Sequence, residues 1–184
     1  MKKFTEESLR KRADADVDAL VKIAPIYWQG DRYKILQEIS RNHKKILSVG
    51  CACREPIIIN ATHACDLSPK SGPILLSNGW QGDFQVASCL DLPYADKSFD
   101  LAVCSEVIEH LPNLSDVVAA IKEVSRVAHH FIITTPNSAK IRPQCQNINH
   151  ILFFTEEKIK DILPFPAKVY LHDHHIYIES ENNV

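Results

Sequence analysis

The residues best suited to chemistry lie in short segments that each follow an apolar run of the sequence. Asp66 follows one run, and its two carboxylate oxygens could accept hydrogen bonds from a pair of ligand hydroxyl groups. Glu106 and His110 follow another, and a histidine there titrates near neutral pH and could remove a proton from an acceptor. Gly50 follows a third, where a backbone without a side chain can pass close to a ligand. The pattern predicts a ligand site at the ends of these runs.

The apolar runs themselves indicate the strands of a sheet. They are short and nearly continuous, and they occupy residues 46–49, 62–65, 84–87, 100–104 and 131–134. Strands that are apolar on both faces belong to parallel sheets with helices on each side. Ligands bind beyond the carboxyl ends of such strands, where the strand order reverses, so the segments after the runs should form one site.

Helices are expected around this sheet, and a hairpin is expected at the end of the chain. Apolar periodicity and capping residues predict helices over residues 5–23, 31–41, 114–128 and 155–163. Residues 24–30 should form a turn, and Asp31 is available to cap the second helix, as Asn113 and Thr155 are for the last two. The hairpin should pair residues 168–172 with 175–179 as two antiparallel strands.

Length and composition favour a single domain in the cytoplasm. The chain has 184 residues, 45% hydrophobic and 24% charged, with a formal net charge of -2. This composition excludes a disordered chain, a collagen-like fibre and a coiled coil. No long basic block marks a nucleic-acid binder, and no apolar run approaches the ~20 residues that cross a bilayer. Because the N-terminus lacks the apolar part of a secretion signal, the six cysteines are expected to be free thiols in a reducing cytoplasm.

The most specific motif spans residues 91–111. It reads DLPYADKSFD followed by LAVCSEVIEHL, and it joins a turn, a buried strand and a loop in a fixed register. This stretch resembles the LPF-x-D-x-SFD…EHL segment of the class I S-adenosylmethionine-dependent methyltransferases, in particular their small-molecule, type 11-like branch. The resemblance extends over about residues 45–163, which is most of the chain.

The resemblance implies an α/β fold, a three-layer sandwich of the Rossmann-like methyltransferase type. Its mostly parallel sheet would have seven strands in the order 3-2-1-4-5-7-6, with the last strand antiparallel. Residues 1–184 would form a single domain, with two helices in residues 1–44 lying over the cofactor cleft and residues 45–184 forming the core. The acceptor site would be built by those helices and the polar loop over residues 136–150.

The resemblance also implies which residues bind the cofactor S-adenosylmethionine and its product S-adenosylhomocysteine. They are Gly50, Cys51, Ala52, Asp66, Leu67, Ser88, Cys89, Leu90 and Ser105. Asp66 would accept hydrogen bonds from both ribose hydroxyls, and we expect it to be solvated when the site is empty. The alternative is that Asp66, with Ser68 and Pro69 after it, only stabilises a turn. The spacing from Gly50 to Asp66 is shorter than the ~20 residues typical of dinucleotide-binding folds, so the helix between them should be short and begin near Pro56.

Several positions depart from the family pattern. Ala52 and Arg54 occupy the places of the second and third glycine, and Ser48 and Ser88 stand where many relatives have an acidic residue. Arg54 could grip the carboxylate of the cofactor, but a solvated arginine at the start of a short helix is favoured. These departures keep open an alternative function, a binding or regulatory module that has kept the fold and lost the chemistry.

His110 and Glu106 are the candidate catalytic residues, because they would lie beside the path of the methyl group. His110 could instead pack under its loop and hydrogen-bond the backbone. Transfer of a methyl group from a sulfonium requires mainly alignment, so no dedicated base is needed. An oxidoreductase is disfavoured, because the third glycine of its fingerprint and a second nucleotide-binding half are both missing.

Two groups of residues contain potential metal ligands, but the sequence predicts no metal site. Cys51, Cys53, His63 and Cys65 could form a zinc site, but their spacing does not match the usual ligand pairs and they overlap the cofactor loop. Residues 172–175 are rich in histidine but should form an exposed turn.

The sequence therefore predicts methyl transfer to a small or medium-sized acceptor that it does not identify. The absence of an Asn-Pro-Pro-Tyr-type segment after the fourth strand argues against methylation of nucleic-acid bases or of glutamine. The expected partner is a small-molecule substrate, with neither nucleic acid nor membrane, and the chain should be a monomer or a homodimer.

Overall fold

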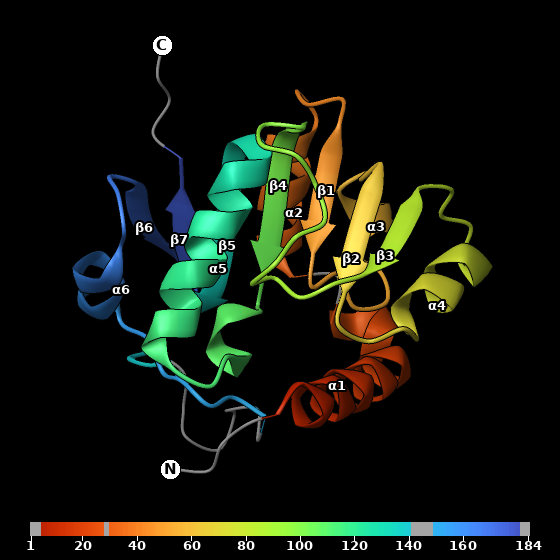
Figure 1. The fold of residues 1–184 in the computed structure, drawn as a ribbon, viewed down its shortest axis with the longest axis horizontal. Coiled ribbons are helices and arrows are strands. Elements are labelled where there is room, and N and C mark those ends of the chain that lie inside the picture. Colours follow the sequence, from red (N-terminus) through yellow and green to blue (C-terminus); the bar gives the residue numbers. More distant parts are fainter. Residues whose placement is uncertain (1–4, 28–29, 141–148, 181–184) are drawn as a thin grey trace.

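The computed structural model describes residues 5–27, 30–140 and 149–180, and for residues 23–27 it describes the backbone only. Seven strands form one sheet in the order β3-β2-β1-β4-β5-β7-β6 (Figure 1). The strands are β1 (Ile46–Val49), β2 (His63–Asp66), β3 (Asp83–Val86), β4 (Phe99–Ser105), β5 (Ala128–Pro136), β6 (Lys168–His172) and β7 (His175–Glu179). The first five are parallel, whereas β7 is antiparallel to both β5 and β6. The predicted strand order is confirmed.

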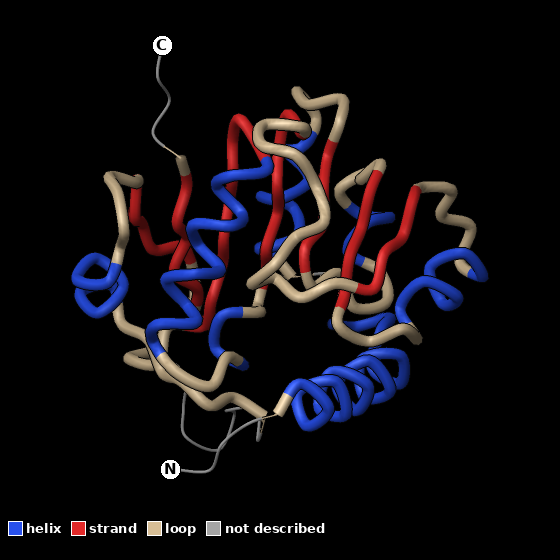
Figure 2. The backbone as a smooth tube through the Cα atoms, viewed as in Figure 1, coloured by secondary structure: helices blue, strands red, loops and turns tan. Residues whose placement is uncertain are grey.

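Helices cover both faces of the sheet, with α5 in front of it and α2 behind it (Figure 2). The helices are α1 (Glu6–Tyr27), α2 (Asp31–Ser40), α3 (Glu55–Ile58), α4 (Ser71–Ser77), α5 (Leu114–Val127) and α6 (Glu156–Ile162), with a short 3-10 helix, η1 (Ile108–His110). The predicted two-strand hairpin and the short helix after Gly50 are both present. In the described residues, no helix is long and apolar enough to span a bilayer.

Alternating side chains of β4 build the two cores of this sandwich. Ala102 and Cys104 belong to the core on the α5 side, whereas Leu101 and Val103 belong to the core on the α2 side. The α5 stripe contributes the buried residues Val117, Ala120, Ile121, Val124 and Val127. Each such apolar side chain contributes about 1.5–3 kcal/mol when it is removed from water, so the two cores fix the sheet and with it the positions of the strand ends.

The observed helix ends show which of the local sequence signals predicted a helix boundary correctly. Asn113 and Thr155 cap α5 and α6 as predicted, because their side chains accept hydrogen bonds from the backbone N–H groups of Asp116 and Lys158. The turn expected over residues 24–30 was wrong in part, since α1 continues to Tyr27. A proline near the end of a helix removes one hydrogen bond only, so Pro25 does not have to terminate α1.

The cap expected at Asp31 was also wrong. Gly30 occupies the N-cap position of α2 without a side-chain hydrogen bond. Asp31 is the first residue of the helix, and its carboxylate accepts a hydrogen bond from Nζ of Lys34 at 2.7 Å. A neighbouring lysine on the same helix face thus attracts the carboxylate away from the backbone N–H groups.

The two N-terminal helices take different positions. α1 crosses the edge of the sheet to which the carboxyl ends of β1, β2 and β4 point (Figure 1). α2 instead packs on one face of the sheet, where Tyr33 and Leu36 are buried against Ile46 and Leu101. The arrangement differs from the expectation that both helices lie over the cleft, because only the first turn of α2 reaches it.

Candidate active site

A cavity of about 730 Å³ lies at the carboxyl ends of the strands. It is lined by every residue that the sequence predicted for the site, namely Gly50, Cys51, Ala52, Asp66, Leu67, Ser88, Cys89, Leu90, Ser105, Glu106 and His110. α1, the first turn of α2 and the segment at residues 149–150 line its other walls. Five separate strand ends therefore meet in one pocket of a size that suits a drug-sized ligand.

Gly50 forms the turn at the end of β1. Its φ of +67° lies in the left-handed region, and a Cβ atom added there would lie 2.4 Å from Cγ2 of Val107. The backbone N–H groups of Gly50 and Cys51 donate to the carbonyl oxygen of Cys65 at 2.8 and 3.1 Å. A side chain at this position would therefore separate the β1 turn from the loop after β4.

Ala52 and Arg54 follow in the same loop. Ala52 has a φ of +48°, which is unfavourable for a residue with a side chain. The position thus requires the backbone conformation for which the family has its second glycine. Arg54 is exposed, begins α3 and does not line the cavity. The structure agrees with a solvated arginine and not with a grip on the cofactor.

Asp66, the last residue of β2, connects two loops. Its Oδ2 accepts a hydrogen bond from the N–H of Ala52 and its Oδ1 one from the N–H of Ser68, both at 2.8 Å. The side chain is buried, with 7% of the residue exposed, so the expectation of a solvated carboxylate was wrong. Burial raises the pKa of Asp66 to about 6. Each oxygen keeps a second lone pair, so the turn-stabilising role leaves acceptors for a ligand.

Glu55 is a pocket residue for which the sequence suggested no role. It is 2% exposed, and the hydroxyl of Ser48 donates to its Oε1 at 2.7 Å. Burial is the main reason why the pKa of Glu55 is raised to about 8. The acid that many relatives carry at the position of Ser48 is therefore present in space but comes from α3. Only the fold of α3 back toward β1 reveals this substitution.

Glu106 does not lie in the pocket as an unpaired base. Its Oε2 is 3.0 Å from Nη1 of Arg32 and 3.6 Å from Nε2 of His175, and its Oε1 accepts a hydrogen bond from the hydroxyl of Thr134 at 3.2 Å. Arg32 comes from α2 and His175 from the start of β7, and both line the cavity. Since its carboxylate is engaged by the guanidinium of Arg32, positioning and electrostatics suit Glu106 better than proton transfer.

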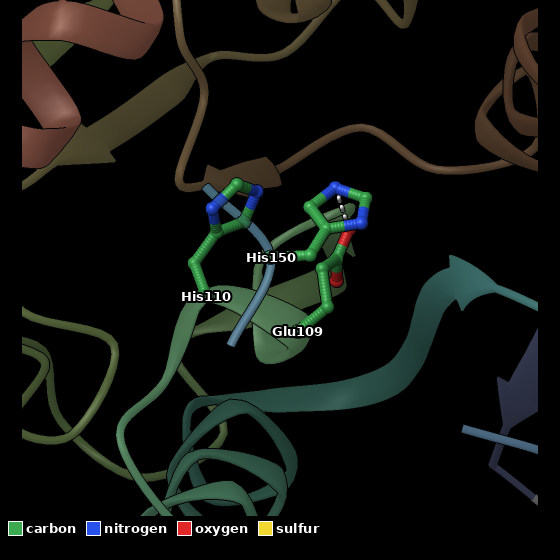
Figure 3. Close-up of side chains that lie close together, drawn as sticks. All are labelled: Glu109, His110 and His150. Carbon is green, nitrogen blue, oxygen red and sulfur yellow. Dashed lines mark ion pairs between the residues drawn. The ribbon is translucent and has the colours of Figure 1, made fainter. Parts of the chain in front are cut away.

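His110 lies on the wall of the pocket beside His150 and Glu109 (Figure 3). The two imidazole rings meet edge to face with their centres 5.0 Å apart. Burial is the main reason why the pKa of His110 is lowered, and it raises the pKa of Glu109 well above the usual range. A neutral imidazole at neutral pH can accept a proton, so the placement of His110 is compatible with the base role predicted for it.

Acidic residues of α1 form hydrogen bonds and an ion pair that hold this helix over the pocket. The hydroxyl of Ser68 donates to Asp14, Lys70 forms an ion pair with Asp18 at 2.7 Å, and the side-chain amide of Asn149 donates to Asp16. The apolar stripe predicted this helix, but no local sequence pattern predicted the contacts of its acidic residues.

The cysteines show no sign of a zinc site. Cys51, Cys53 and Cys65 are buried free thiols. Within the described ranges, they do not come together with His63 as a set of metal ligands. Cys145 lies outside the described residues.

Comparisons with known proteins agree with this architecture. Residues 47–131 match the family model of a methyltransferase domain. No curated protein matches the chain significantly. Among solved structures, the N-methyltransferase NodS from Bradyrhizobium japonicum, in complex with S-adenosylhomocysteine, has a TM-score of 0.68 at 16% identity and covers 91% of this chain and 97% of its own.

Two further structures share the fold. A Burkholderia thailandensis 1,6-didemethyltoxoflavin-N1-methyltransferase with bound S-adenosylhomocysteine has a TM-score of 0.64 at 14% identity, over 97% of this chain and 91% of its own. The [4+2]-cyclase SpnF has a TM-score of 0.65 at 17% identity, over 90% of this chain and 75% of its own. The family match over residues 47–131 and the sheet order both support the resemblance to the class I S-adenosylmethionine-dependent methyltransferases.

Proposed function

We propose that this protein transfers a methyl group from S-adenosylmethionine to a small or medium-sized acceptor. The observation that carries the proposal is the convergence of all the predicted cofactor residues, from four different strand ends, on one cavity. S-adenosylmethionine supplies an electrophilic methyl group on a positively charged sulfur. The chain has to bind this cation, align it with an acceptor and exclude water.

The cofactor would lie along the carboxyl ends of β1, β2 and β3. Asp66 accepts hydrogen bonds from the ribose hydroxyls through the lone pairs that its backbone partners leave, while Ser88 and the backbone after it contact the adenine. Gly50 lets the backbone pass close to the amino-acid part of the cofactor. Glu55 receives the ammonium group of that part, which restores the acid that Ser48 lacks.

Electrostatics favour a cation in this pocket. The carboxylates of Glu55, Asp66 and Asp16 line it, and those of Glu55 and Asp66 are removed from water. A buried carboxylate interacts more strongly with a positive ligand than a solvated one, because the surrounding dielectric constant is low. Burial raises the pKa of Glu55 to about 8 and that of Asp66 to about 6, and a cationic ligand would lower both.

The acceptor would enter from the side of α1 and residues 149–150. This wall lies beside Glu106 and His110 and completes the cavity. Glu106, held by Arg32, orients the acceptor by accepting a hydrogen bond from it, and His110 takes a proton where the acceptor loses one. Alignment by these groups is sufficient for transfer to an amine or hydroxyl.

The alternative is a protein that binds the cofactor without transferring its methyl group. It is favoured by the altered β1 loop, with Ala52 in a conformation suited to glycine, and by the likeness in fold to a cyclase. Release of S-adenosylhomocysteine in the presence of a panel of amine, phenol and carboxylate acceptors separates the two functions.

Binding of S-adenosylhomocysteine tests the proposal directly. At 100 times its dissociation constant the ligand should stabilise the fold by about 2.7 kcal/mol, which a thermal melt detects, whereas NAD should have no effect. In calorimetric titrations, affinity should rise as the pH increases from 5 to 7.5. At pH 5 only about a tenth of a group with a pKa of about 6 is ionised, and Glu55, with a pKa of about 8, is almost entirely protonated, so binding should be at least tenfold weaker there.

The variant Asp66→Asn tests whether Asp66 binds the cofactor. It should weaken binding roughly ten- to a hundredfold at pH 7.5, because an amide presents a donor to one ribose hydroxyl. It should also remove the part of the pH dependence that is due to Asp66 and leave the part that is due to Glu55. Asp91→Asn, outside the cavity lining, is the matched control and should behave as the wild type. Wild-type affinity and pH dependence in Asp66→Asn would exclude the ribose assignment.

A further inference from the structure

Three potential metal ligands meet at one wall of the pocket. η1 supplies Glu109 and His110, and His150 lies on the segment that follows the long loop after β5. One ligand atom from each of these residues lies within 4.8 Å of the others. Figure 3 shows the two imidazoles side by side, with the carboxylate of Glu109 directed at His150. His110 and His150 both line the cavity, so a ligand can reach them.

The carboxylate of Glu109 is only half satisfied. The residue is 1% exposed, and its Oε2 accepts a hydrogen bond from the hydroxyl of Thr135 at 3.0 Å. Its Oε1 has no hydrogen-bond partner among the described residues, and Nε2 of His150 lies 3.9 Å away, beyond hydrogen-bond distance. Buried carboxylate oxygens normally have a hydrogen-bond partner, so the unpartnered Oε1 of Glu109 indicates a position for a ligand.

The carboxylate of Asp16 lies close to one ring nitrogen of His110. Its Oδ2 lies 3.6 Å from Nδ1 of His110, and that nitrogen is buried without a hydrogen-bond partner in the described chain. Metal-binding histidines commonly donate one ring N–H to a carboxylate, which fixes the tautomer and leaves the lone pair of the other nitrogen for the ion. Asp16 needs to move by less than 1 Å to make this bond.

We propose that Glu109, His110 and His150 bind one divalent transition-metal ion in the pocket. Two imidazoles and one carboxylate form a three-ligand set with open positions, of the type that binds zinc, cobalt or iron. The sequence predicted no metal from the cysteines with His63 and from residues 172–175, and it did not bring Glu109, His110 and His150 together. His150 is remote from η1 in the sequence, so no spacing rule connects the three.

The backbone already holds the ligands near the required geometry. The N–H groups of Ile151 and Leu152 donate to the carbonyl oxygen of Glu109 at 2.9 and 3.0 Å, which ties the His150 segment to η1. Ligand atoms ~2.1 Å from an ion lie about 3.3 Å apart. The present separations therefore have to shorten by about 1.5 Å at most, which side-chain rotation provides.

The open positions of the ion would take an oxygen atom of the methyl acceptor. This part of the inference rests on the proposed function, because the ion lies in the cavity to which we assign the acceptor. Acceptors with two adjacent oxygen atoms, such as vicinal diols and hydroxy acids, would bind best, since they chelate. With the ion bound, His110 would be a ligand and could not act as the base. The ion would instead lower the pKa of a bound hydroxyl, which would lose its proton to water before methylation.

Titration with cobalt(II) tests the site, because its visible absorption reports the ligands. Chelator-treated wild type should bind one Co²⁺, and both His150→Gln and Glu109→Gln should bind it at least tenfold more weakly. His174→Gln, in the exposed β6–β7 turn, should match the wild type, and circular dichroism melts control for folding. Unchanged binding in His150→Gln, or a sulfur-to-cobalt charge-transfer band, would overturn the site.

A second arm addresses the acceptor. Acetohydroxamate, a small chelator with two oxygen atoms, should change the spectrum of the Co²⁺-loaded wild type, and an unchanged spectrum would overturn the assignment of the open positions. Calorimetry with S-adenosylhomocysteine on chelator-treated protein reports the cofactor site by itself. A failure of the metal site is thereby distinguished from a failure of the proposed function.

Discussion

Glu55 places a buried acid beside Ser48 at the end of β1. The hydroxyl of Ser48 and the carboxylate of Glu55 are hydrogen-bonded at 2.7 Å, so together they present one acid at the end of β1. This carboxylate is costly to the empty protein, because burial opposes its charge. A cationic ligand would offset that cost, and the residue therefore favours binding over stability.

The cost should appear as a pH dependence of stability. The pKa of Glu55 is about 8 in the fold, against an ordinary value of 4.5. Between these values the folded state holds a proton that the unfolded state has lost, so the free energy of unfolding should fall as the pH rises from about 4.5 to 8. Glu55→Gln keeps an acceptor for Ser48 and removes the ionisation. It should be more stable than the wild type at pH 8, by on the order of 3 kcal/mol, with little difference near pH 4.5.

Urea unfolding at pH 4.5, 6 and 8 measures this difference. Glu6→Gln, at an exposed position of α1, is the matched control and should follow the wild type. Glu55→Gln should also bind S-adenosylhomocysteine more weakly. A variant that is less stable than the wild type at pH 8 would contradict this account. It would show that Ser48 and Arg32 offset the cost of burying the ionised carboxylate.

Ala52 offers a second test at the scale of one residue. At a φ of +48° an L-residue costs roughly 1–2 kcal/mol relative to glycine, while glycine loses about 0.5–1 kcal/mol more backbone entropy on folding. Ala52→Gly should therefore keep or raise stability by up to about 1 kcal/mol. Ala119→Gly, exposed in the middle of α5, should lose about 1 kcal/mol. Equal losses in urea unfolding would show that the left-handed conformation of Ala52 is not strained.

At the scale of elements, α1 and α5 are attached to the protein in different ways. α5 buries five residues of its stripe in the main core. Among the α1 side chains that the structure describes, only Val17 is buried. Polar contacts of α1 with Ser68, Lys70 and Asn149 complete its attachment. These contacts are half-buried or exposed, and polar contacts of this kind contribute little free energy, so we expect α1 to open without unfolding of the sheet.

Hydrogen exchange should reveal this opening. We expect the amides of α1 to exchange through local opening at a much lower free energy than those of α5. S-adenosylhomocysteine should slow exchange in α1, since the helix covers the pocket, and should leave α5 nearly unchanged. Mass spectrometry of peptides from the two helices makes the comparison within one sample. Equal protection of α1 and α5 in the ligand-free protein would contradict this account.

At the scale of the whole molecule, the described cysteines are buried, and two of them, Cys51 and Cys89, lie in the wall of the cavity. Cys51, Cys53, Cys65, Cys89 and Cys104 are buried free thiols. Burial raises the pKa of all five, and that of Cys89 to about 12. Since the thiolate is the reactive form, these groups should be inert until the fold opens.

Thiol labelling in a Cys145→Ser background measures global opening. We expect no reaction of the native protein with Ellman's reagent within minutes and reaction of all five thiols in denaturant, with S-adenosylhomocysteine slowing labelling at intermediate urea concentrations. The background is needed because Cys145 lies outside the described residues. Rapid labelling of one native equivalent would locate a thiol that the fold does not protect.

The sequence by itself determined the sheet, most helices and which residues at the strand ends line the pocket. β1, α5 and the β6–β7 hairpin were predictable because apolar periodicity, caps and turn residues act over a few neighbours. Gly50, Asp66 and the segment at residues 91–111 lie directly at strand ends, so a correct strand pattern places them at one edge of the sheet.

Only the tertiary structure decided what each side chain of the pocket contacts. Arg32 reaches His175 across 143 positions of the sequence and holds Glu106 between α2 and β7. Glu55 replaces an acid on another element, and His150 joins η1 through backbone hydrogen bonds. The physical reason is that buried charges are satisfied by whatever partner the packing brings within a few ångströms, and such partners leave no periodic or local trace in the chain.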